Sequence, residues 1–100
     1  MTKPESADAA SQIERTVEVS NRRGLHARAS AKFCAVAGSF DATVTVRRDD
    51  VEVGGCSIMG LLMLGAGKGS EITIIAKGPQ ASLAIETLAR LVDEKFGEGE

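Results

Sequence analysis

The sequence predicts a two-layer α+β sandwich, in which helices cover one face of a β-sheet and the other face is open to solvent. Segments in which apolar and polar residues alternate are interleaved with segments of helical spacing, in the order strand, helix, strand, strand, helix, strand, helix. The helices are apolar along one stripe, which they can bury by sharing one face of the sheet. A length of 100 residues and a hydrophobic content of 43% suit one domain with a single modest core.

We expect strands at residues 15–19, 42–47, 51–53 and 71–77, where the alternation is clearest. Asp49-Asp50 supplies the turn between the second and third strands. The polar side chains of the first two strands should face solvent on the open side of the sheet. These side chains are Thr16, Glu18, Thr43, Thr45 and Arg47.

Three helices are expected. Residues 27–37 are rich in alanine and contain no proline or glycine, and Gly38 ends this helix. Its apolar stripe consists of Ala29, Phe33, Val36 and Ala37. Ser57 is the expected N-cap of a short apolar helix over residues 58–64, which Gly65 closes. The last helix starts at Gly78-Pro79 and has an apolar face made of Ala81, Ile85, Leu88 and Val92.

The only histidine, His26, lies where a turn at residues 21–24 leads into the first helix. At the N-cap or first helical position, its ring is beside backbone N–H groups that have no partner inside the helix. These amides, the positive end of the helix dipole and the guanidinium of Arg28 favour an anion on the imidazole. A lone histidine is more often a surface residue or a cap. The surroundings favour the anion site, because the segment from Arg15 to Arg48 is strongly basic in a slightly acidic protein.

Two motifs together resemble a known family. Gly24-Leu25-His26-Ala27-Arg28 precedes an alanine-rich helix, and Gly55-Cys56-Ser57-Ile58-Met59-Gly60-Leu61 follows later in the chain. This pattern resembles HPr, the histidine-containing phosphocarrier of the bacterial phosphoenolpyruvate-dependent phosphotransferase system, from about Arg15 to Phe96. The resemblance implies a four-stranded antiparallel sheet in the order 1-4-2-3, covered on one face by three helices (βαββαβα).

The resemblance also implies a mechanism. His26 would accept a phosphoryl group from Enzyme I and pass it to a histidine of an Enzyme IIA protein. Arg28 and the backbone amides of Ala27, Arg28 and Ala29 would stabilise the phosphate. Such a carrier needs no cofactor and no metal, and it is an intermediate in phosphotransfer without turnover of its own. Members of the family commonly have proline after the arginine, whereas this chain has Ala29, which keeps an N–H that proline lacks.

Ser57 and the apolar helix after it form a second candidate site. In HPr proteins regulated by HPr kinase/phosphorylase, the serine that opens this helix is phosphorylated, so Ser57 is both a cap and a regulatory candidate. The helix has more large apolar residues than one buried face requires, namely Ile58, Met59, Leu61, Leu62 and Met63. We therefore expect partner docking at Lys32, Ile58, Met59 and Leu62, although a short helix could also bury most of its apolar set.

Composition excludes several classes of function. A net charge of −2 and the absence of tryptophan and tyrosine argue against nucleic-acid binding. No segment approaches the length of a membrane span, and two cysteines without an apolar leader indicate free thiols in a reducing cytoplasm. We expect a cytoplasmic monomer. Residues 1–14 are expected to be a flexible extension, residues 15–96 the HPr-like domain and residues 97–100 a solvated tail.

Two alternatives remain at the level of the sequence. The chain could be an α+β interaction or anion-binding effector module, in which His26 only caps the helix. If it is a phosphocarrier, the motifs fit either sugar uptake or a regulatory, nitrogen-related phosphotransfer chain.

Overall fold

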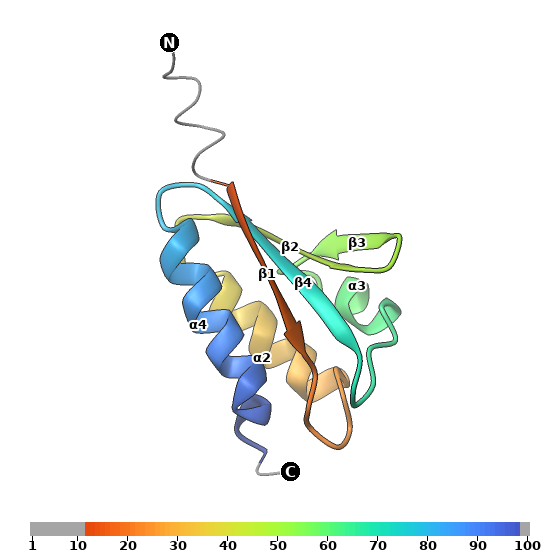
Figure 1. Ribbon diagram of the computed structural model, residues 1–100. Helices are drawn as coiled ribbons and strands as arrows, with labels where there is room; N and C mark the ends of the chain where they lie inside the picture. The colour runs from red at the N-terminus through yellow and green to blue at the C-terminus, as the bar shows by residue number, and fades with distance from the viewer. Residues whose placement is uncertain (1–11, 99–100) are drawn as a thin grey trace.

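The described residues, 12–98 in the computed structural model, form a four-stranded sheet and three α-helices in the predicted order, followed by a short 3₁₀ turn (Figure 1). The elements are β1 (Gln12–Glu18), α2 (Ala27–Ala37), β2 (Thr43–Arg48), β3 (Val51–Gly54), α3 (Ile58–Met63), β4 (Glu71–Lys77), α4 (Ala81–Asp93) and η1 (Lys95–Gly97). No helix in this part of the chain is long and apolar enough to cross a membrane.

The sheet is antiparallel and its strand order is β1-β4-β2-β3, which confirms the order that the resemblance implies. β4 therefore lies in the centre beside β1, although the two strands are far apart in the sequence. Thr16 of β1 lies opposite Thr73 of β4, and their hydroxyl oxygens are 2.9 Å apart on the exposed side of the sheet. On the same strand β4, Ile74 lies opposite Val46 of β2, and both side chains are buried.

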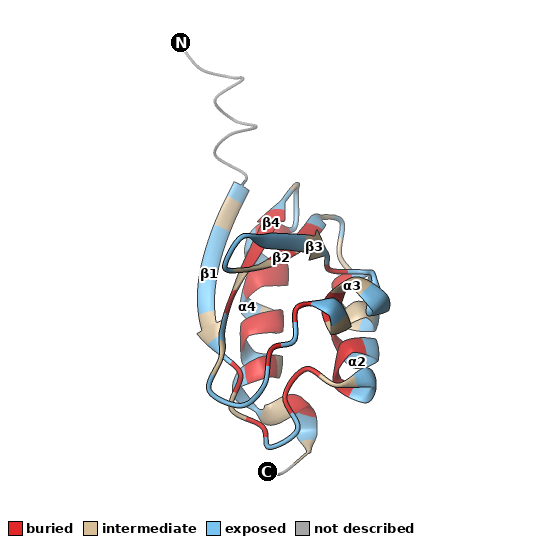
Figure 2. Ribbon diagram, turned by 90° about the vertical axis from the view of Figure 1, so that its right-hand side faces the viewer, coloured by how far each residue is buried: buried red, intermediate tan, exposed pale blue. Residues whose placement is uncertain are grey.

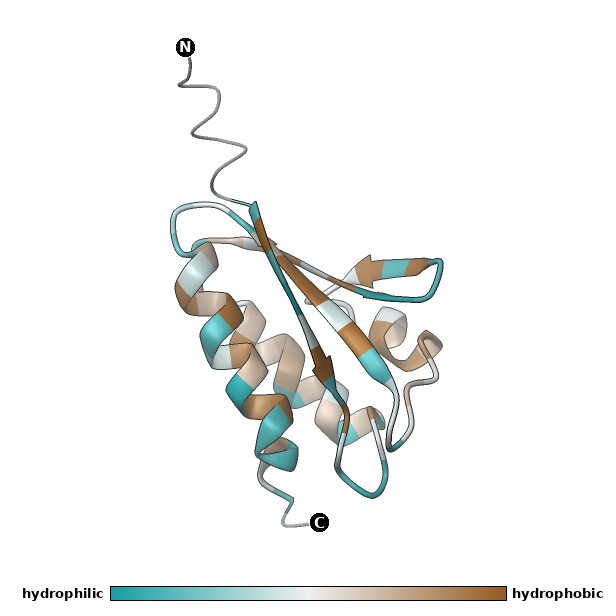
Figure 3. Ribbon diagram, viewed as in Figure 1, coloured by the Kyte–Doolittle hydropathy of each residue, from teal (hydrophilic) through white to brown (hydrophobic). Residues whose placement is uncertain are grey.

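The hydrophobic core lies between one face of the sheet and the helices. In Figure 2, buried residues gather on the sides of α2 and α4 that meet the sheet, while β1 is largely exposed. Figure 3 shows the same division as alternating apolar and polar residues along β4 and α4. The largest fully buried side chains are Phe33, Phe96, Leu61, Ile72, Ile74 and Leu88. The five polar residues predicted on the open face are exposed or half-buried.

Some boundaries differ from the prediction. β1 begins at Gln12, inside the segment assigned to the flexible extension, because residues 12–14 pair with residues 75–77 of β4. The rest of that segment, residues 1–11, lies outside the described residues. β2 starts and ends one residue later than predicted, and β3 is one residue longer. α4 starts at Ala81 and not at Gly78-Pro79, because Gly78 has a φ of 129°, which is incompatible with a right-handed helix.

The first helix also differs in one detail of its buried stripe. Ala29, Phe33 and Ala37 are buried as predicted, but Val36 is only half-buried. Ser30 takes a buried place instead, and its hydroxyl donates a 3.2 Å hydrogen bond to the carbonyl oxygen of Leu25. The buried face of the helix therefore consists of Ala29, Ser30, Phe33 and Ala37.

A tight turn determines where α2 starts. Gly24 has a φ of 68°, and a β-carbon at this position would lie 2.5 Å from the carbonyl oxygen of Ala66. The same oxygen accepts a 2.8 Å hydrogen bond from the amide of Leu25. Only glycine fits between these two loops, so Gly24 fixes the approach of the chain to His26.

Substitution of Gly24 by alanine should destabilise the fold. The left-handed backbone alone costs about 1–2 kcal/mol, and the contact with Ala66 adds to it. Gly67→Ala is the matched control in the facing loop, because a β-carbon there meets nothing within 4 Å. Urea denaturation of both variants measures the difference, and equal stability of the two would contradict the role given to Gly24.

Candidate functional site

His26 is the N-cap of α2, as predicted. Its backbone is extended, with φ −80° and ψ −176°, and its side chain makes no capping hydrogen bond. The first hydrogen bond of the helix runs from the amide of Ser30 to the carbonyl oxygen of His26, at 2.8 Å. The amides of Ala27, Arg28 and Ala29 precede this bond, so they have no partner inside the helix. The imidazole is therefore attached where free amides and the positive helix end coincide.

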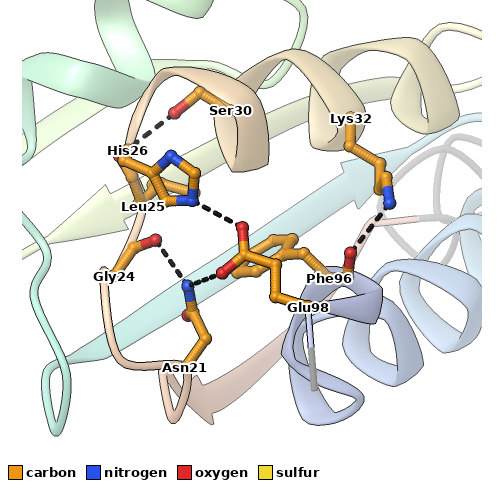
Figure 4. Close-up of polar contacts among 8 residues, drawn as sticks. All are labelled: Asn21, Gly24, Leu25, His26, Ser30, Lys32, Phe96 and Glu98. Atoms are coloured by element: carbon orange, nitrogen blue, oxygen red, sulfur yellow. Dashed lines mark hydrogen bonds and ion pairs between the residues drawn. The ribbon is translucent and has the colours of Figure 1, made fainter. Parts of the chain in front are cut away.

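The His26 ring is partly accessible, with 18% of its side chain exposed. Its Nε2 lies 2.5 Å from Oε2 of Glu98. The second ring nitrogen, Nδ1, points away from Glu98 (Figure 4). Within residues 12–98, Nε2 is thus the ring nitrogen with a hydrogen-bond partner, and Nδ1 is available.

Glu98 and Asn21 are site residues that the sequence analysis missed. The Glu98 side chain is 17% exposed, whereas the tail from residue 97 was expected to be solvated. Its Oε1 accepts a 3.0 Å hydrogen bond from Nδ2 of Asn21, which also donates to the carbonyl oxygen of Gly24 at 2.8 Å. Asn21 is completely buried, and its Oδ1 has no partner in the described structure. Asn21 therefore connects the turn before His26 to the C-terminal segment (Figure 4).

The C-terminal segment reaches His26 through an unusual turn after α4. Lys95 and Phe96 have φ angles of 59° and 55°, in the left-handed region that side chains rarely adopt. Phe96 is only 1% exposed, and its carbonyl oxygen accepts a 2.8 Å hydrogen bond from Nζ of Lys32. Core packing and the Lys32 contact together hold the turn and direct Glu98 to the imidazole. Lys32, predicted for partner docking, thus also has a structural contact.

A shallow cavity of about 380 Å³ opens beside the imidazole. It is lined, besides His26, by Arg23, Arg28, Lys32, Phe96, Gly97 and Glu98. The described lining thus contains three cationic side chains and one carboxylate. Partial burial raises the pKa of Glu98, but the hydrogen bonds from His26 and Asn21 and the charge of Arg23 outweigh this effect, so its pKa lies below its usual value.

This arrangement suits the binding or covalent transfer of an anionic group. It combines a nucleophilic ring nitrogen, free amides and cations, whereas no group of three or more metal-binding side chains occurs within the described range. A larger cavity of about 580 Å³ lies along β1 and α4, and none of the predicted site residues lines it. The predicted residues His26, Arg28 and Lys32 instead line the smaller cavity.

The second candidate site surrounds the start of α3. Ser57 is its N-cap, as predicted, and its Oγ accepts a 3.0 Å hydrogen bond from the amide of Gly60. Met59 and Met63 are 69% and 75% exposed, and Ile58 is 41% exposed. Leu62 is half-buried, and Leu61 is fully buried, so Leu61 belongs to the core and not to the docking candidates. α3 packs against α2, the helix that carries His26.

Cys34 of α2 and Cys56, next to Ser57, are free thiols. Burial and then the neighbouring Cys34 raise the pKa of Cys56, so its reactive thiolate form is disfavoured. We assign neither cysteine a chemical role.

The comparisons with known proteins agree with this geometry. Residues 13–94 match the family model described as "PTS HPr component phosphorylation site". Phosphocarrier protein NPr of Shewanella violacea is 41% identical over 87 residues, which cover 87% of this chain and 96% of that protein. Phosphocarrier protein HPr of Cupriavidus necator is 43% identical over 88 residues, covering 88% and 99%.

Solved structures of HPr proteins have the same fold as this chain. A crystal structure of HPr from Thermoanaerobacter tengcongensis superposes with a TM-score of 0.83 at 38% identity, covering 86% of this chain and 97% of the other. For HPr from Bacillus anthracis the TM-score is 0.76 at 39% identity, covering 79% and 94%.

The lowered pKa of Glu98 predicts a pH-dependent stability. Ionised Glu98 stabilises the fold at pH values above its ordinary pKa, and this contribution is lost as the pH falls through the lowered value. Glu98→Gln should therefore be less stable than the natural protein near neutral pH, and the difference should shrink in acid. Urea denaturation over a pH series measures it, with the exposed Glu94→Gln as control. A difference independent of pH would contradict the assignment.

Proposed function

Since the chain belongs to the HPr family of phosphotransferase-system phosphocarriers, we propose that His26 carries the phosphoryl group. It accepts the group from Enzyme I and passes it to a histidine of an Enzyme IIA protein. The observation that supports this proposal most directly is the place of His26 at the N-cap of α2, with a partly exposed ring beside free amides.

The proposed reaction uses Nδ1, because Nε2 is engaged by Glu98. A bond forms between Nδ1 and phosphorus while the bond between phosphorus and the donor group of Enzyme I breaks. Phosphoryl transfer depends mainly on positioning and on charge stabilisation. The amides of Ala27, Arg28 and Ala29 and the guanidinium of Arg28 provide these on the carrier, and the docked partner completes the site. Ala29, in place of the family's proline, contributes one of the three amides.

The proposal covers both branches of the system that use such carriers. NPr and HPr proteins are similar to this chain at 41% and 43% identity, so the carrier serves either a nitrogen-related regulatory chain or sugar uptake. We place it in the cytoplasm as a monomer, where Enzyme I and Enzyme IIA proteins can each cover the same histidine in turn.

The docking surface in this proposal consists of Lys32 and the exposed side of α3. Ile58, Met59 and the half-buried Leu62 offer apolar contacts, and methionine adapts to partners of different shape. α3 adjoins the helix of His26, so a partner seated on α3 also reaches the imidazole.

Ser57 is a proposed regulatory site on the same surface. Its hydroxyl is exposed and lies two residues from Met59. A phosphate on Ser57 suits the helix start but adds negative charge beside the docking surface. HPr kinase/phosphorylase is the proposed modifying enzyme, and weaker docking to Enzyme I is the expected consequence.

Incubation with Enzyme I and phosphoenolpyruvate should add one phosphoryl group to the protein. The modification should be labile in acid and stable in base, as expected for phosphohistidine, and His26→Ala should abolish it. Intact-protein mass spectrometry measures the addition. Binding of inorganic phosphate without any covalent addition would favour the anion-binding module instead.

A negative charge on α3 should slow phosphorylation by Enzyme I without unfolding the protein. Met59→Glu and Ser57→Asp are the test variants, and aspartate keeps the N-cap function of Ser57. Loss of a docking contact that contributes about 1.4 kcal/mol corresponds to a decrease of about tenfold in kcat/KM for the carrier. Leu83→Glu is the matched control, because Leu83 is 49% exposed on α4. Equal rates for all three variants would exclude α3 as the docking surface.

A further inference from the structure

Glu98 approaches His26 closely, yet in the proposed transfer it only occupies Nε2 and does not contact the phosphoryl group. Its Oε2 lies 2.5 Å from Nε2 of His26, on the side of the ring that Nδ1 does not face. A carboxylate far from the reacting nitrogen neither binds nor donates a phosphoryl group. Its effect on the reaction must therefore pass through the ring.

The chemistry of the two groups determines which atom carries the proton. An ionised carboxylate only accepts hydrogen bonds, so Nε2 must be the donor in this contact. A neutral imidazole has one protonated and one unprotonated nitrogen. With the proton on Nε2, the lone pair lies on Nδ1.

We propose that Glu98 is a positioning residue, which holds His26 in the tautomer whose Nδ1 lone pair is free to attack phosphorus. This inference rests on the proposed function for its consequence, although the tautomer exists without any partner. The nearest parallel is the carboxylate that orients a catalytic histidine through its other nitrogen.

Three contacts keep the Glu98 carboxylate in place. Asn21 donates a 3.0 Å hydrogen bond to Oε1, Phe96 is buried two residues earlier, and Lys32 binds the carbonyl oxygen of Phe96. Asn21 is itself buried and bound to Gly24 in the turn before His26. These contacts therefore fix the carboxylate relative to Asn21, where the turn before His26 begins, and to His26 itself.

The hydrogen bond between Glu98 and His26 also assists the transfer of the phosphoryl group to Nδ1. When Nδ1 bonds to phosphorus, Nε2 keeps its proton and the ring becomes positively charged. Glu98 stabilises this charge. When the phosphoryl group leaves for the next histidine, the electron pair returns to Nδ1, and no proton has to move.

The other charged groups that line the cavity are cations. Arg23 comes from the turn before His26, and Arg28 and Lys32 come from α2. They favour the phosphoryl group but disfavour a positively charged ring. Among the described residues that line this cavity, Glu98 is the only acidic one, and its charge offsets that effect on the imidazole.

The test is the tautomer of His26 in the unphosphorylated protein, measured by ¹⁵N NMR of labelled histidine near neutral pH and above. In the natural protein we expect one neutral tautomer, with Nε2 protonated. Glu98→Ala should give averaged shifts of two tautomers, and Glu98→Gln, whose amide oxygen can still accept the hydrogen bond, should restore part of the preference. Glu94→Gln should match the natural protein.

The rate of phosphorylation by Enzyme I is the second readout. We expect a decrease of about tenfold for Glu98→Ala and a smaller one for Glu98→Gln, as for the loss of one charge-assisted hydrogen bond. Unchanged ¹⁵N shifts in Glu98→Ala would overturn the inference even if phosphorylation proceeds normally. Absence of phosphorylation with the expected tautomer would instead overturn the proposed function.

Discussion

The start of α2 at His26 is the constraint on which the site depends. Gly24 allows a left-handed turn against the Ala66 loop, and the helical hydrogen bonds begin only at Ser30. The imidazole and three free amides consequently share one helix end. A shift of the helix start by one residue would separate them, and the same side chains would then form an ordinary surface.

In the proposed function, the distribution of charge around this helix end allows one small site both to hold and to release a phosphoryl group. Arg23, Arg28 and Lys32 favour the anion, while Glu98 binds the opposite side of the ring. The protein as a whole carries a net charge of −2, so the positive potential is local. The open, shallow cavity leaves the completion of the site to whichever partner is docked.

Much of the fold could be predicted because its signals are local. Alternating apolar and polar residues predict the strand at residues 71–77. A high alanine content and a closing glycine predict the helix at residues 27–37. Both elements have the expected bounds. The pairing of β1 with β4 joins distant segments, and only the resemblance to HPr supplied it. Glu98 could not be identified, because its position depends on the left-handed turn at Lys95 and Phe96 and on the burial of Phe96. No periodic pattern encodes such a contact, and the glutamate-rich sequence there is typical of a solvated tail.

The identity of the phosphorylated ring nitrogen tests the central claim most directly. NMR measurement of the coupling between ³¹P and ¹⁵N in the phosphorylated, ¹⁵N-labelled protein distinguishes the two nitrogens of His26. We predict that the phosphoryl group is bound to Nδ1, with Nε2 still protonated and facing Glu98. A phosphoryl group on Nε2 would contradict the account, because it would have to replace the carboxylate that the structure places there.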